Sequence, residues 1–169
     1  MATTPASTRR LFEGTVVSLE LEDWGAGYEH EVVRHLGAAA VVPVTPDGDV
    51  LLVRQWRPAI RDHLVEIPAG LLDVDGEDAL TCAGRELREE TGYRHGSIEF
   101  LGGYYASAGF TDEYVHLFLA RTLAEPEGEP EDGIELLREP FDQMVAAARG
   151  GKVRDVKTAY ALLLAAARG

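Results

Sequence analysis

The segment from Ala38 to Val44, AAAVVPV, is a continuous run of apolar residues. Such a run is typical of a central strand that is buried on both faces of a sheet. A tight turn is expected at Pro46 to Asp49, and Val50 to Trp56 is the predicted partner strand. Because a strand buried on both sides needs a layer on each side, we expect a sheet core between helices.

Most of the remaining chain consists of apolar stretches separated by turns and loops. Further strands are expected at Gly14 to Leu21, Tyr28 to His35, His63 to Pro68, Ile98 to Tyr105, Tyr114 to Ala120 and Ile134 to Arg138. Helices are expected at Gly76 to Gly92, Phe141 to Arg149 and Thr158 to Arg168. The predicted fold class is therefore α+β, with one mixed β-sheet core sandwiched between helices.

The chain is predicted to hold a single domain over residues 11–169, after a flexible N-terminus at residues 1–10. The first two strands can pair across the turn at Trp24 to Gly27, which predicts an N-terminal β-hairpin of about residues 11–36. No internal repeat and no linker long enough to separate a second domain is visible in the sequence.

Composition limits the partners and the compartment. The net charge is −13, which argues against binding to nucleic acid or to an anionic membrane. Residues 1–10 lack the apolar centre of a signal sequence. Cys82 is the only cysteine, which excludes a disulfide framework and predicts a cytoplasmic location. A protein this acidic can hold a polyanionic substrate only if cations lie between them.

The segment from Ala69 to Gly92, AGLLDVDGEDALTCAGRELREETG, combines a glycine-rich acidic loop with a glutamate-rich helix. The helix is expected to open at Gly76-Glu77-Asp78, with acidic residues in its first turn, and to end at Gly92 as a C-cap. Its core-facing stripe is expected to contain Leu80, Ala83, Gly84 and Leu87.

Three glutamates of this helix are the candidate catalytic and metal-ligating groups. Glu86 and Glu90 lie one turn apart along one edge of the core stripe, and Glu89 lies on the neighbouring ridge. Clustered like charges are unfavourable unless a positive group lies among them. Carboxylates are hard ligands that suit Mg²⁺ or Mn²⁺. Arg85 is expected to orient one of the three glutamates. The alternative is a solvent-exposed helix laced with pairs such as Arg85–Glu89.

Residues 69–93 resemble the Nudix box, G-x5-E-x7-R-E-U-x-E-E-x-G-U, in which U is a bulky apolar residue. The matching positions are Gly70, Glu77, Arg85, Glu86, Leu87, Glu89, Glu90, Gly92 and Tyr93. One departure matters, because six residues rather than five separate Gly70 from Glu77. Segments outside the box are similar to the ADP-ribose pyrophosphatase branch of that family: Val53 to Pro58, Glu66 to Gly70, Ser107 to Glu113 and Val153 to Thr158.

The resemblance implies an enzyme that cleaves the diphosphate of ADP-ribose with water and divalent cations, giving AMP and ribose 5-phosphate. A close alternative is a broader pyrophosphatase that acts on another nucleoside diphosphate sugar, such as GDP-mannose, or on a flavin or dinucleotide diphosphate. An alternative from another class is a sensor domain that binds ADP-ribose without cleaving it.

The resemblance also implies which residues hold two to three Mg²⁺ or Mn²⁺ ions. Glu86 and Glu90 are implied as the principal ligands, with Glu89 as a further ligand or water partner and the Ala69 carbonyl completing one coordination shell. The branch takes one more acid, as a metal ligand or general base, from a late acidic loop, which in this chain is Glu125 to Gly133. Counted back from Ile134, that position falls on Asp132, whereas the position of the usual second acid falls on Pro130. Glu129 and Glu131 are therefore candidates by a shifted register, with simple solvation as the alternative for each of the three acids.

Substrate contacts are implied on several other segments. Arg57 and Arg54 are implied to contact the phosphates or the terminal ribose, with a surface ion pair as the alternative. Glu113 is implied to reach a ribose hydroxyl or a metal-bound water. The candidates for stacking on adenine are Trp24, Tyr28 and Phe110, with core packing as the alternative.

In this branch the N-terminal strands exchange between two subunits, and the substrate site is shared across a two-fold dimer. The resemblance therefore implies a homodimer whose partner molecule is a small nucleoside diphosphate. The alternative is a hairpin that caps its own sheet.

Overall fold

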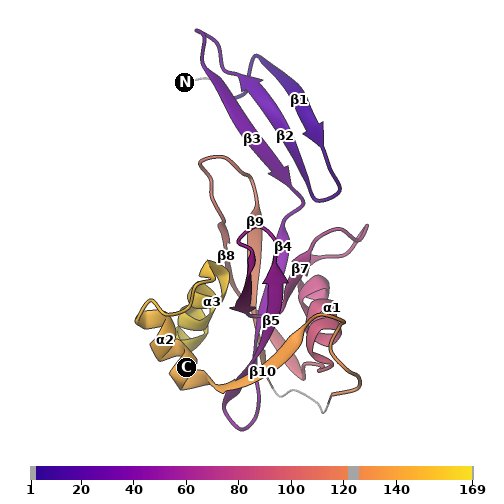
Figure 1. The fold of residues 1–169 in the computed structure, drawn as a ribbon, viewed down its shortest axis with the longest axis vertical. Helices are drawn as coiled ribbons and strands as arrows, with labels where there is room; N and C mark the ends of the chain where they lie inside the picture. The colour runs from indigo at the N-terminus through magenta and orange to yellow at the C-terminus, as the bar shows by residue number, and fades with distance from the viewer. Residues whose placement is uncertain (1–2, 122–125, 169) are drawn as a thin grey trace.

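The computed structural model describes residues 3–121 and 126–168 and divides them between two sheets (Figure 1). A three-stranded sheet near the N-terminus projects from one end of a larger body. The body contains a seven-stranded sheet and, within the described ranges, three helices. This arrangement confirms the predicted α+β class.

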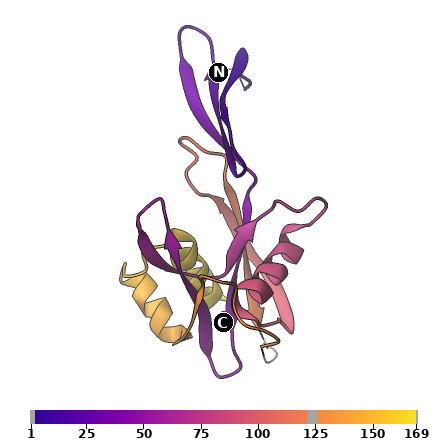
Figure 2. The ribbon, with the colours of Figure 1, turned by 45° about the vertical axis from the view of Figure 1, so that its right-hand side comes forward.

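The larger sheet has the strand order β10-β5-β4-β9-β8, with β6 paired to β5 and β7 paired to β4. Its strands are β4 (Ala38–Val44), β5 (Asp49–Arg57), β6 (Asp62–Glu66), β7 (Ala69–Leu71), β8 (Ser97–Tyr105), β9 (Tyr114–Arg121) and β10 (Glu135–Pro140). The sheet is mixed, because β4 runs parallel to β9 and antiparallel to β5 and β7. The β5–β6 hairpin stands away from the rest of this sheet (Figure 2).

The helices cover both faces of this sheet. They are α1 (Ala79–Thr91) on one face and α2 (Phe141–Arg149) and α3 (Val156–Ala167) on the other. Along β4, Ala39 and Val41 pack in the cluster that contains α1 residues, whereas Ala40 and Val42 pack in the cluster that contains α3 residues. All four are fully buried, so the apolar run lies at the centre of the sheet, as its sequence predicts. No helix in the described part of the chain is long and apolar enough to cross a membrane.

Aspartate caps set the start of two helices. The Asp78 carboxylate accepts a hydrogen bond from the Thr81 backbone N–H at 2.8 Å, so α1 begins at Ala79. The expected acidic first turn is therefore wrong, because Glu77 precedes the helix. Asp155 accepts from the Thr158 backbone N–H in the same way, and α3 begins two residues earlier than predicted.

The buried face of α1 differs from the predicted stripe at one end. Ala83 and Leu87 are buried as expected, but Leu80 is 44% exposed and Cys82 is buried instead. The Cys82 Sγ lies 3.4 Å from the carbonyl oxygen of Leu71, so α1 packs against β7 as well as β4. Contact with β7 turns the buried face toward Cys82 and leaves Leu80 in solvent.

The N-terminal sheet is a meander of β1 (Ser7–Glu13), β2 (Val17–Asp23) and β3 (Glu29–His35). The predicted flexible N-terminus is wrong for residues 7–10, which belong to β1 and pair with residues 20–23. Residues 1–2 lie outside the described ranges. A third strand therefore joins the predicted hairpin of residues 11–36. Every β1 residue is exposed, so the strand has no burial pattern to reveal it. It is held by backbone pairing with β2 and by the ion pair of Arg10 with Glu20 at 2.9 Å.

The loop between β8 and β9 joins this sheet to the body. The Val33 backbone N–H donates to the Phe110 carbonyl at 2.7 Å, and the Asp112 N–H donates to the Val33 carbonyl at 3.3 Å. The segment from Ser107 to Glu113 is therefore docked on β3.

Candidate active site

Strand β7 and the glutamates of α1 are in direct contact. A Cβ atom placed on Gly70 would lie 2.0 Å from Cδ and Oε1 of Glu86, so the Glu86 carboxylate occupies the space that any other residue would need for its side chain. The Ala69 backbone N–H donates to Oε2 of Glu90 at 3.0 Å. The two glutamates predicted as principal ligands therefore face adjacent residues of one short strand.

Arg85 links the acidic groups around this strand. Its guanidinium donates to both carboxylate oxygens of Glu77, each at 2.9 Å. It also donates to Glu86 at 2.5 Å and to Glu89 at 3.0 Å. Arg85 therefore orients three glutamates rather than one, and the i,i+4 pair with Glu89 is part of the same network. These hydrogen bonds, led by those of Glu77, raise the pKa of Arg85.

The extra residue of the box is accommodated in the loop before α1. The Glu77 N–H donates to the Val74 carbonyl at 3.0 Å, and Gly76 has a φ of +79°. This turn needs glycine, because a side chain is strained at positive φ. Since Glu77 still reaches Arg85, the longer spacing does not separate the loop from the helix.

Glu90 and Glu86 are carboxylates with little exposure to water. Glu90 is 5% exposed, and burial raises its pKa to about 7, although the Ala69 hydrogen bond and the charge of Arg57 act in the opposite direction. Burial also raises the pKa of Glu86, whose side chain is 12% exposed. Two neighbouring carboxylates that are both costly to ionise form a site that a cation stabilises.

The donor set fits Mg²⁺ or Mn²⁺, because it consists of carboxylate oxygens beside a glycine backbone. Within residues 3–121 and 126–168, no three His, Cys, Asp or Glu side chains are already gathered as a metal-binding group. The contacts explain this, because Arg85 engages Glu86 and Glu89 while Glu90 bonds to Ala69.

The two candidate arginines of β5 have different environments. Arg54 pairs with Glu135 at 2.8 Å, and both side chains are largely exposed. Arg54 therefore forms a surface ion pair, which was the alternative to a contact with substrate. Arg57 instead pairs with the buried Glu66, at 2.7 Å from Nε and 2.6 Å from Nη2. Sequence reasoning gave Glu66 no role, although it belongs to one of the segments similar to the ADP-ribose pyrophosphatase branch.

The late acidic loop is attached to the C-terminal end of α1. The Glu131 N–H donates to the Glu89 carbonyl at 3.1 Å. A Cβ atom on Gly92 would lie 2.3 Å from the Gly128 carbonyl oxygen, so the loop backbone lies directly on the helix C-cap. Among the three candidate acids, Glu131 is the one whose backbone is hydrogen-bonded to the backbone of a box glutamate. Glu129 lines a pocket of about 270 Å³ with Arg88 and Arg94, and Asp132 lies in an exposed turn.

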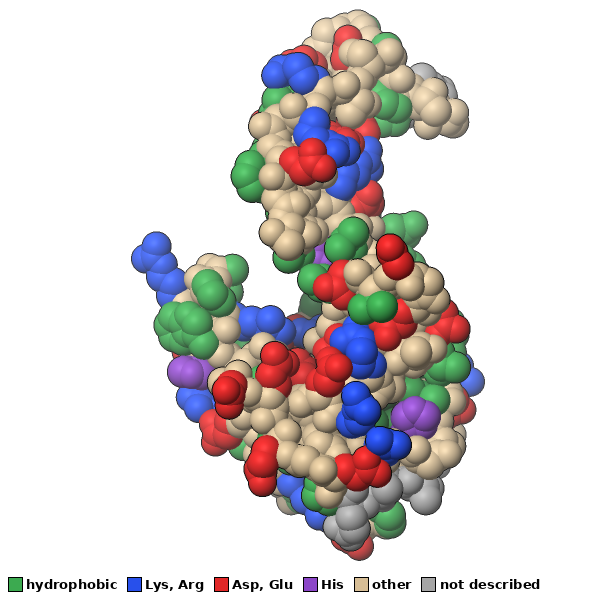
Figure 3. Space-filling model, turned by 90° about the vertical axis from the view of Figure 1, so that its right-hand side faces the viewer, with side chains coloured by type: hydrophobic (Ala, Val, Ile, Leu, Met, Phe, Trp, Pro, Cys, Tyr) green, Lys and Arg blue, Asp and Glu red, His purple; other side chains and the backbone are tan. Residues whose placement is uncertain are grey.

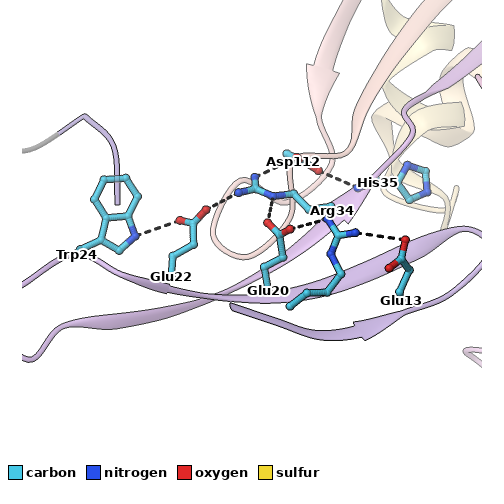
Figure 4. Close-up of polar contacts among 8 residues, drawn as sticks. Glu13, Glu20, Glu22, Trp24, Arg34, His35 and Asp112 are labelled. Atoms are coloured by element: carbon cyan, nitrogen blue, oxygen red, sulfur yellow. Dashed lines mark hydrogen bonds and ion pairs between the residues drawn. The ribbon is translucent and has the colours of Figure 1, made fainter. Parts of the chain in front are cut away.

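A second pocket, of about 300 Å³, lies between the N-terminal sheet and the β8–β9 loop. Trp24 and Phe110 line it, together with Glu22, Arg34 and Asp112. Arg34 donates to Glu20, Glu22 and Asp112, which ties the sheet to the loop (Figure 4). No residue of the Nudix box lines this pocket, so within one chain the structure does not bring the aromatic candidates to the glutamates.

The two remaining substrate candidates lie beside this pocket rather than in it. Tyr28 is 60% exposed, and its hydroxyl lies 3.3 Å from Nδ1 of His30. The Glu113 carboxylate lies 4.0 Å from Nε2 of His35.

The surface of the protein is hollowed beneath the N-terminal sheet (Figure 3). Acidic side chains gather on the body beside this hollow, and basic side chains lie among them. This distribution agrees with a net charge of −13 and favours a site in which cations accompany a polyanion.

Comparison with known proteins gives a family match over most of the chain. The model of the NUDIX domain matches residues 33–159. An ADP-ribose pyrophosphatase of Bacillus subtilis (strain 168) is 37% identical over 161 residues, which are 90% of this chain and 86% of that protein. A methanol dehydrogenase activator of Bacillus methanolicus is 35% identical, covering 92% of this chain and 88% of that protein.

A further relative and a solved structure complete this comparison. A GDP-mannose pyrophosphatase of Cronobacter sakazakii (strain ATCC BAA-894) is 35% identical, covering 78% of this chain and 78% of that protein. The crystal structure of an ADP compounds hydrolase superimposes with a TM-score of 0.81, covering 98% of this chain and 92% of that chain. Its sequence is 21% identical, so this likeness concerns the fold.

Proposed function

Because this chain belongs to the NUDIX domain family, we propose that it hydrolyses the diphosphate of ADP-ribose, giving AMP and ribose 5-phosphate. The observation that carries the proposal is the contact of Glu86 and Glu90 with Ala69 and Gly70 of β7. Relatives named ADP-ribose pyrophosphatase and GDP-mannose pyrophosphatase support a nucleoside diphosphate sugar as the substrate.

Nudix hydrolases generally need divalent cations, and we assign two to three Mg²⁺ or Mn²⁺ ions to this site. Glu86 and Glu90 would hold them, with Glu89 and the Ala69 carbonyl as further ligands. When bound, such ions neutralise the diphosphate and lower the pKa of a coordinated water. Arg85 keeps Glu86 and Glu89 together, since its guanidinium contacts both.

The reaction forms one phosphorus–oxygen bond from water and breaks one within the diphosphate. A base must take the proton of the attacking water. We assign this role to the late loop and favour Glu131, because its backbone is hydrogen-bonded to Glu89. Glu129 and Asp132 are the other candidates in that loop.

Substrate binding is assigned to Arg57 for the phosphates. The pocket containing Trp24 and Phe110 is assigned to the adenine, with Tyr28 and Glu113 beside it. Arg54 takes part only if its exposed pair with Glu135 opens. Since this pocket and the box do not meet within one chain, we propose a homodimer in which the N-terminal sheet of one subunit completes the site of the other.

Exposed apolar side chains on and beside the N-terminal sheet support the dimer, because such groups mark protein contacts. They are Leu11, Phe12, Val16, Val17 and Leu36. The proposal also includes a cytoplasmic location and no nucleic acid partner. The free thiol of Cys82 and the net charge of −13 support these two points.

The test is a panel of ADP-ribose, GDP-mannose, a flavin diphosphate and a dinucleotide, each incubated with Mg²⁺, Mn²⁺ or EDTA. Fastest metal-dependent release of AMP from ADP-ribose supports the proposal. Comparable turnover of several compounds would replace it by the broader pyrophosphatase. Tight, metal-independent binding of ADP-ribose without cleavage would instead identify a sensor domain.

A further inference from the structure

Glu66, at the end of β6, is a buried carboxylate that contacts two cations. Its side chain is 3% exposed. Arg57 contacts only its Oε2, through Nε at 2.7 Å and Nη2 at 2.6 Å. The ammonium of Lys157, in the first turn of α3, donates to its Oε1. Because a different cation engages each oxygen, the carboxylate is fixed in one orientation.

Lys157 is itself held in place by α3. Its side chain is 15% exposed, and its Nζ lies 3.1 Å from Oδ2 of the helix cap Asp155. The neighbouring Thr158 is fully buried, and its hydroxyl accepts a hydrogen bond from the Ile67 N–H at 2.8 Å. The first turn of α3 therefore contacts both Glu66, through Lys157, and Ile67, through Thr158, shortly before β7 begins.

Because Lys157 engages one oxygen of Glu66, it limits the contacts that Arg57 can make with the same carboxylate. Guanidinium groups favour bidentate contact with both oxygens of a carboxylate. Lys157 occupies Oε1, so Arg57 uses Nε and Nη2 on Oε2, and neither of these contacts uses Nη1. The Arg57 side chain is 38% exposed, and its positive charge lowers the pKa of Glu90 against the larger effect of burial. Glu66 stands three residues before Ala69, whose N–H donates to Glu90, so its partner Arg57 lies on the side of the sheet end that carries the box glutamates, with part of its guanidinium open to solvent.

We propose that Lys157 is a positioning residue for substrate: through Glu66, it keeps the Arg57 guanidinium turned toward the diphosphate. Without Lys157, Oε1 of Glu66 is a buried, unpaired charge, and Arg57 turns to engage both oxygens. The guanidinium is then withdrawn from the substrate. This inference rests on the proposed function, because it requires Arg57 to bind the diphosphate.

A double-mutant cycle tests the coupling. The variants are Lys157→Met, Arg57→Ala and their combination, and the measured quantity is the Kd for α,β-methylene ADP-ribose with Mg²⁺, obtained by calorimetry. We expect Lys157→Met to weaken binding roughly tenfold in the unmodified chain, as coupled neighbours do. In the Arg57→Ala background the same change should have no effect on Kd. Additive effects in the two backgrounds would overturn the proposal.

Steady-state kinetics separate positioning from general damage. We expect Lys157→Met to raise the KM for ADP-ribose while kcat changes by less than about threefold. Lys157→Arg should restore KM, because it returns a cation to Oε1 of Glu66. A fall in kcat alone, or a failure of Lys157→Arg to restore KM, would contradict the positioning role. If Lys157→Met does not fold, Lys157→Ala also removes the donor from Oε1 of Glu66 and leaves room for water there, and it replaces Lys157→Met in the same cycle.

The matched control is Arg154→Ala. Arg154 is a cation three residues before Lys157, but it is 62% exposed and pairs with Asp62 rather than Glu66. It should leave both Kd and KM unchanged, and an effect equal to that of Lys157→Met would contradict a specific role for Lys157. Failure of the unmodified chain to bind the analogue contradicts the proposed substrate. Binding by the unmodified chain together with additive variants contradicts only the role of Lys157.

Discussion

The glutamate helix and the N-terminal sheet both carry clustered charges, but they support them in different ways. Helix α1 lies on a fully buried layer that includes Ala83 and Leu87, and its acids face the backbone of β7. In the N-terminal sheet, Glu20 and Glu22 gather around Arg34, while every residue of β1 is exposed. The glutamates of α1 are therefore supported by the hydrophobic core. The charged residues of the N-terminal sheet are supported by ion pairs at the joint, which is the contact of this sheet with the β8–β9 loop.

This difference separates what one chain can build alone from what it completes with a partner. The box glutamates keep their geometry because the core fixes the helix that carries them. The N-terminal sheet keeps its place through Arg34, which pairs with Asp112 at 3.1 Å, and through backbone contacts with the β8–β9 loop. Changes in the box should therefore remove activity, whereas changes at the joint should release the sheet.

The largest effect is expected for Glu90→Gln. Glutamine is isosteric and neutral, so the fold should persist, but a metal ligand is lost. We expect a loss of about 4 kcal/mol of transition-state stabilisation, or roughly a thousandfold in kcat/KM for ADP-ribose. Glu99→Gln, on the exposed part of β8, is the matched control and should keep full activity. Near-normal turnover by Glu90→Gln would remove the metal-site assignment.

Gly70→Ala should reduce both stability and activity. The added methyl group would meet the Glu86 carboxylate at 2.0 Å, so this carboxylate must move out of its place between Gly70 and Arg85, or β7 and α1 must separate. We expect about 1–3 kcal/mol less stability in urea unfolding and no detectable metal-dependent cleavage. At Gly150 the nearest atom to an added Cβ is 3.4 Å away, so Gly150→Ala should be neutral in both assays. Equal behaviour of the two variants would show that the close approach at Gly70 is unimportant.

Metal binding should stabilise the body of the protein without any substrate. An ion that binds only the folded state at about 100 times its Kd adds about 2.7 kcal/mol. We therefore expect Mn²⁺ to raise the Tm in scanning calorimetry and EDTA to reverse the shift. The shift should be much smaller in Glu90→Gln, and an equal shift in both proteins would place the ion elsewhere.

Arg34→Ala should loosen the N-terminal sheet while leaving the body intact. The change removes the shared partner of Glu20, Glu22 and Asp112. We expect amide hydrogens of β2 and β3 to exchange at least about tenfold faster, with unchanged exchange in β4. Arg9→Ala, on the exposed strand β1, is the control and should not alter exchange in either sheet. Parallel loss of protection in β4 would show that the two regions are not independent.

The smallest effect is a dependence of the N-terminal sheet on pH. Hydrogen bonds from Arg34 and then from Arg10 lower the pKa of Glu20 in the folded chain. Its contribution is therefore fully present above the unfolded pKa of about 4.3 and is lost as pH falls through the lower, folded pKa. We expect hydrogen exchange in β2 to accelerate in this acidic range. Unchanged exchange there would contradict the role of the Glu20 pair.

The parts that the sequence predicts are those with a repeating pattern. The apolar run from Ala38 to Val44 predicts a buried central strand, and helical spacing places Glu86 and Glu90 side by side. Leu80 is mispredicted because contact with β7 turns the helix face toward Cys82. Strand β1 is missed because it buries nothing, so neither kind of periodicity marks it.

Contacts between distant positions could not be read from the pattern. Lys157 and Glu66 are 91 residues apart, and no local rule pairs them. The choice of Arg57 over Arg54 as the arginine beside the glutamates depends on strand pairing, since Arg54 faces Glu135 of β10. These contacts are set by topology and become visible only when the sheet is assembled.

The most direct test is the metal dependence of ADP-ribose cleavage by the unmodified chain. The protein would be incubated with ADP-ribose and Mg²⁺, or with ADP-ribose and EDTA, and the products would be separated by chromatography. The arrangement of Glu86 and Glu90 on β7 predicts AMP and ribose 5-phosphate with Mg²⁺ and intact ADP-ribose with EDTA. Equal cleavage under both conditions would contradict a catalytic metal site at these glutamates.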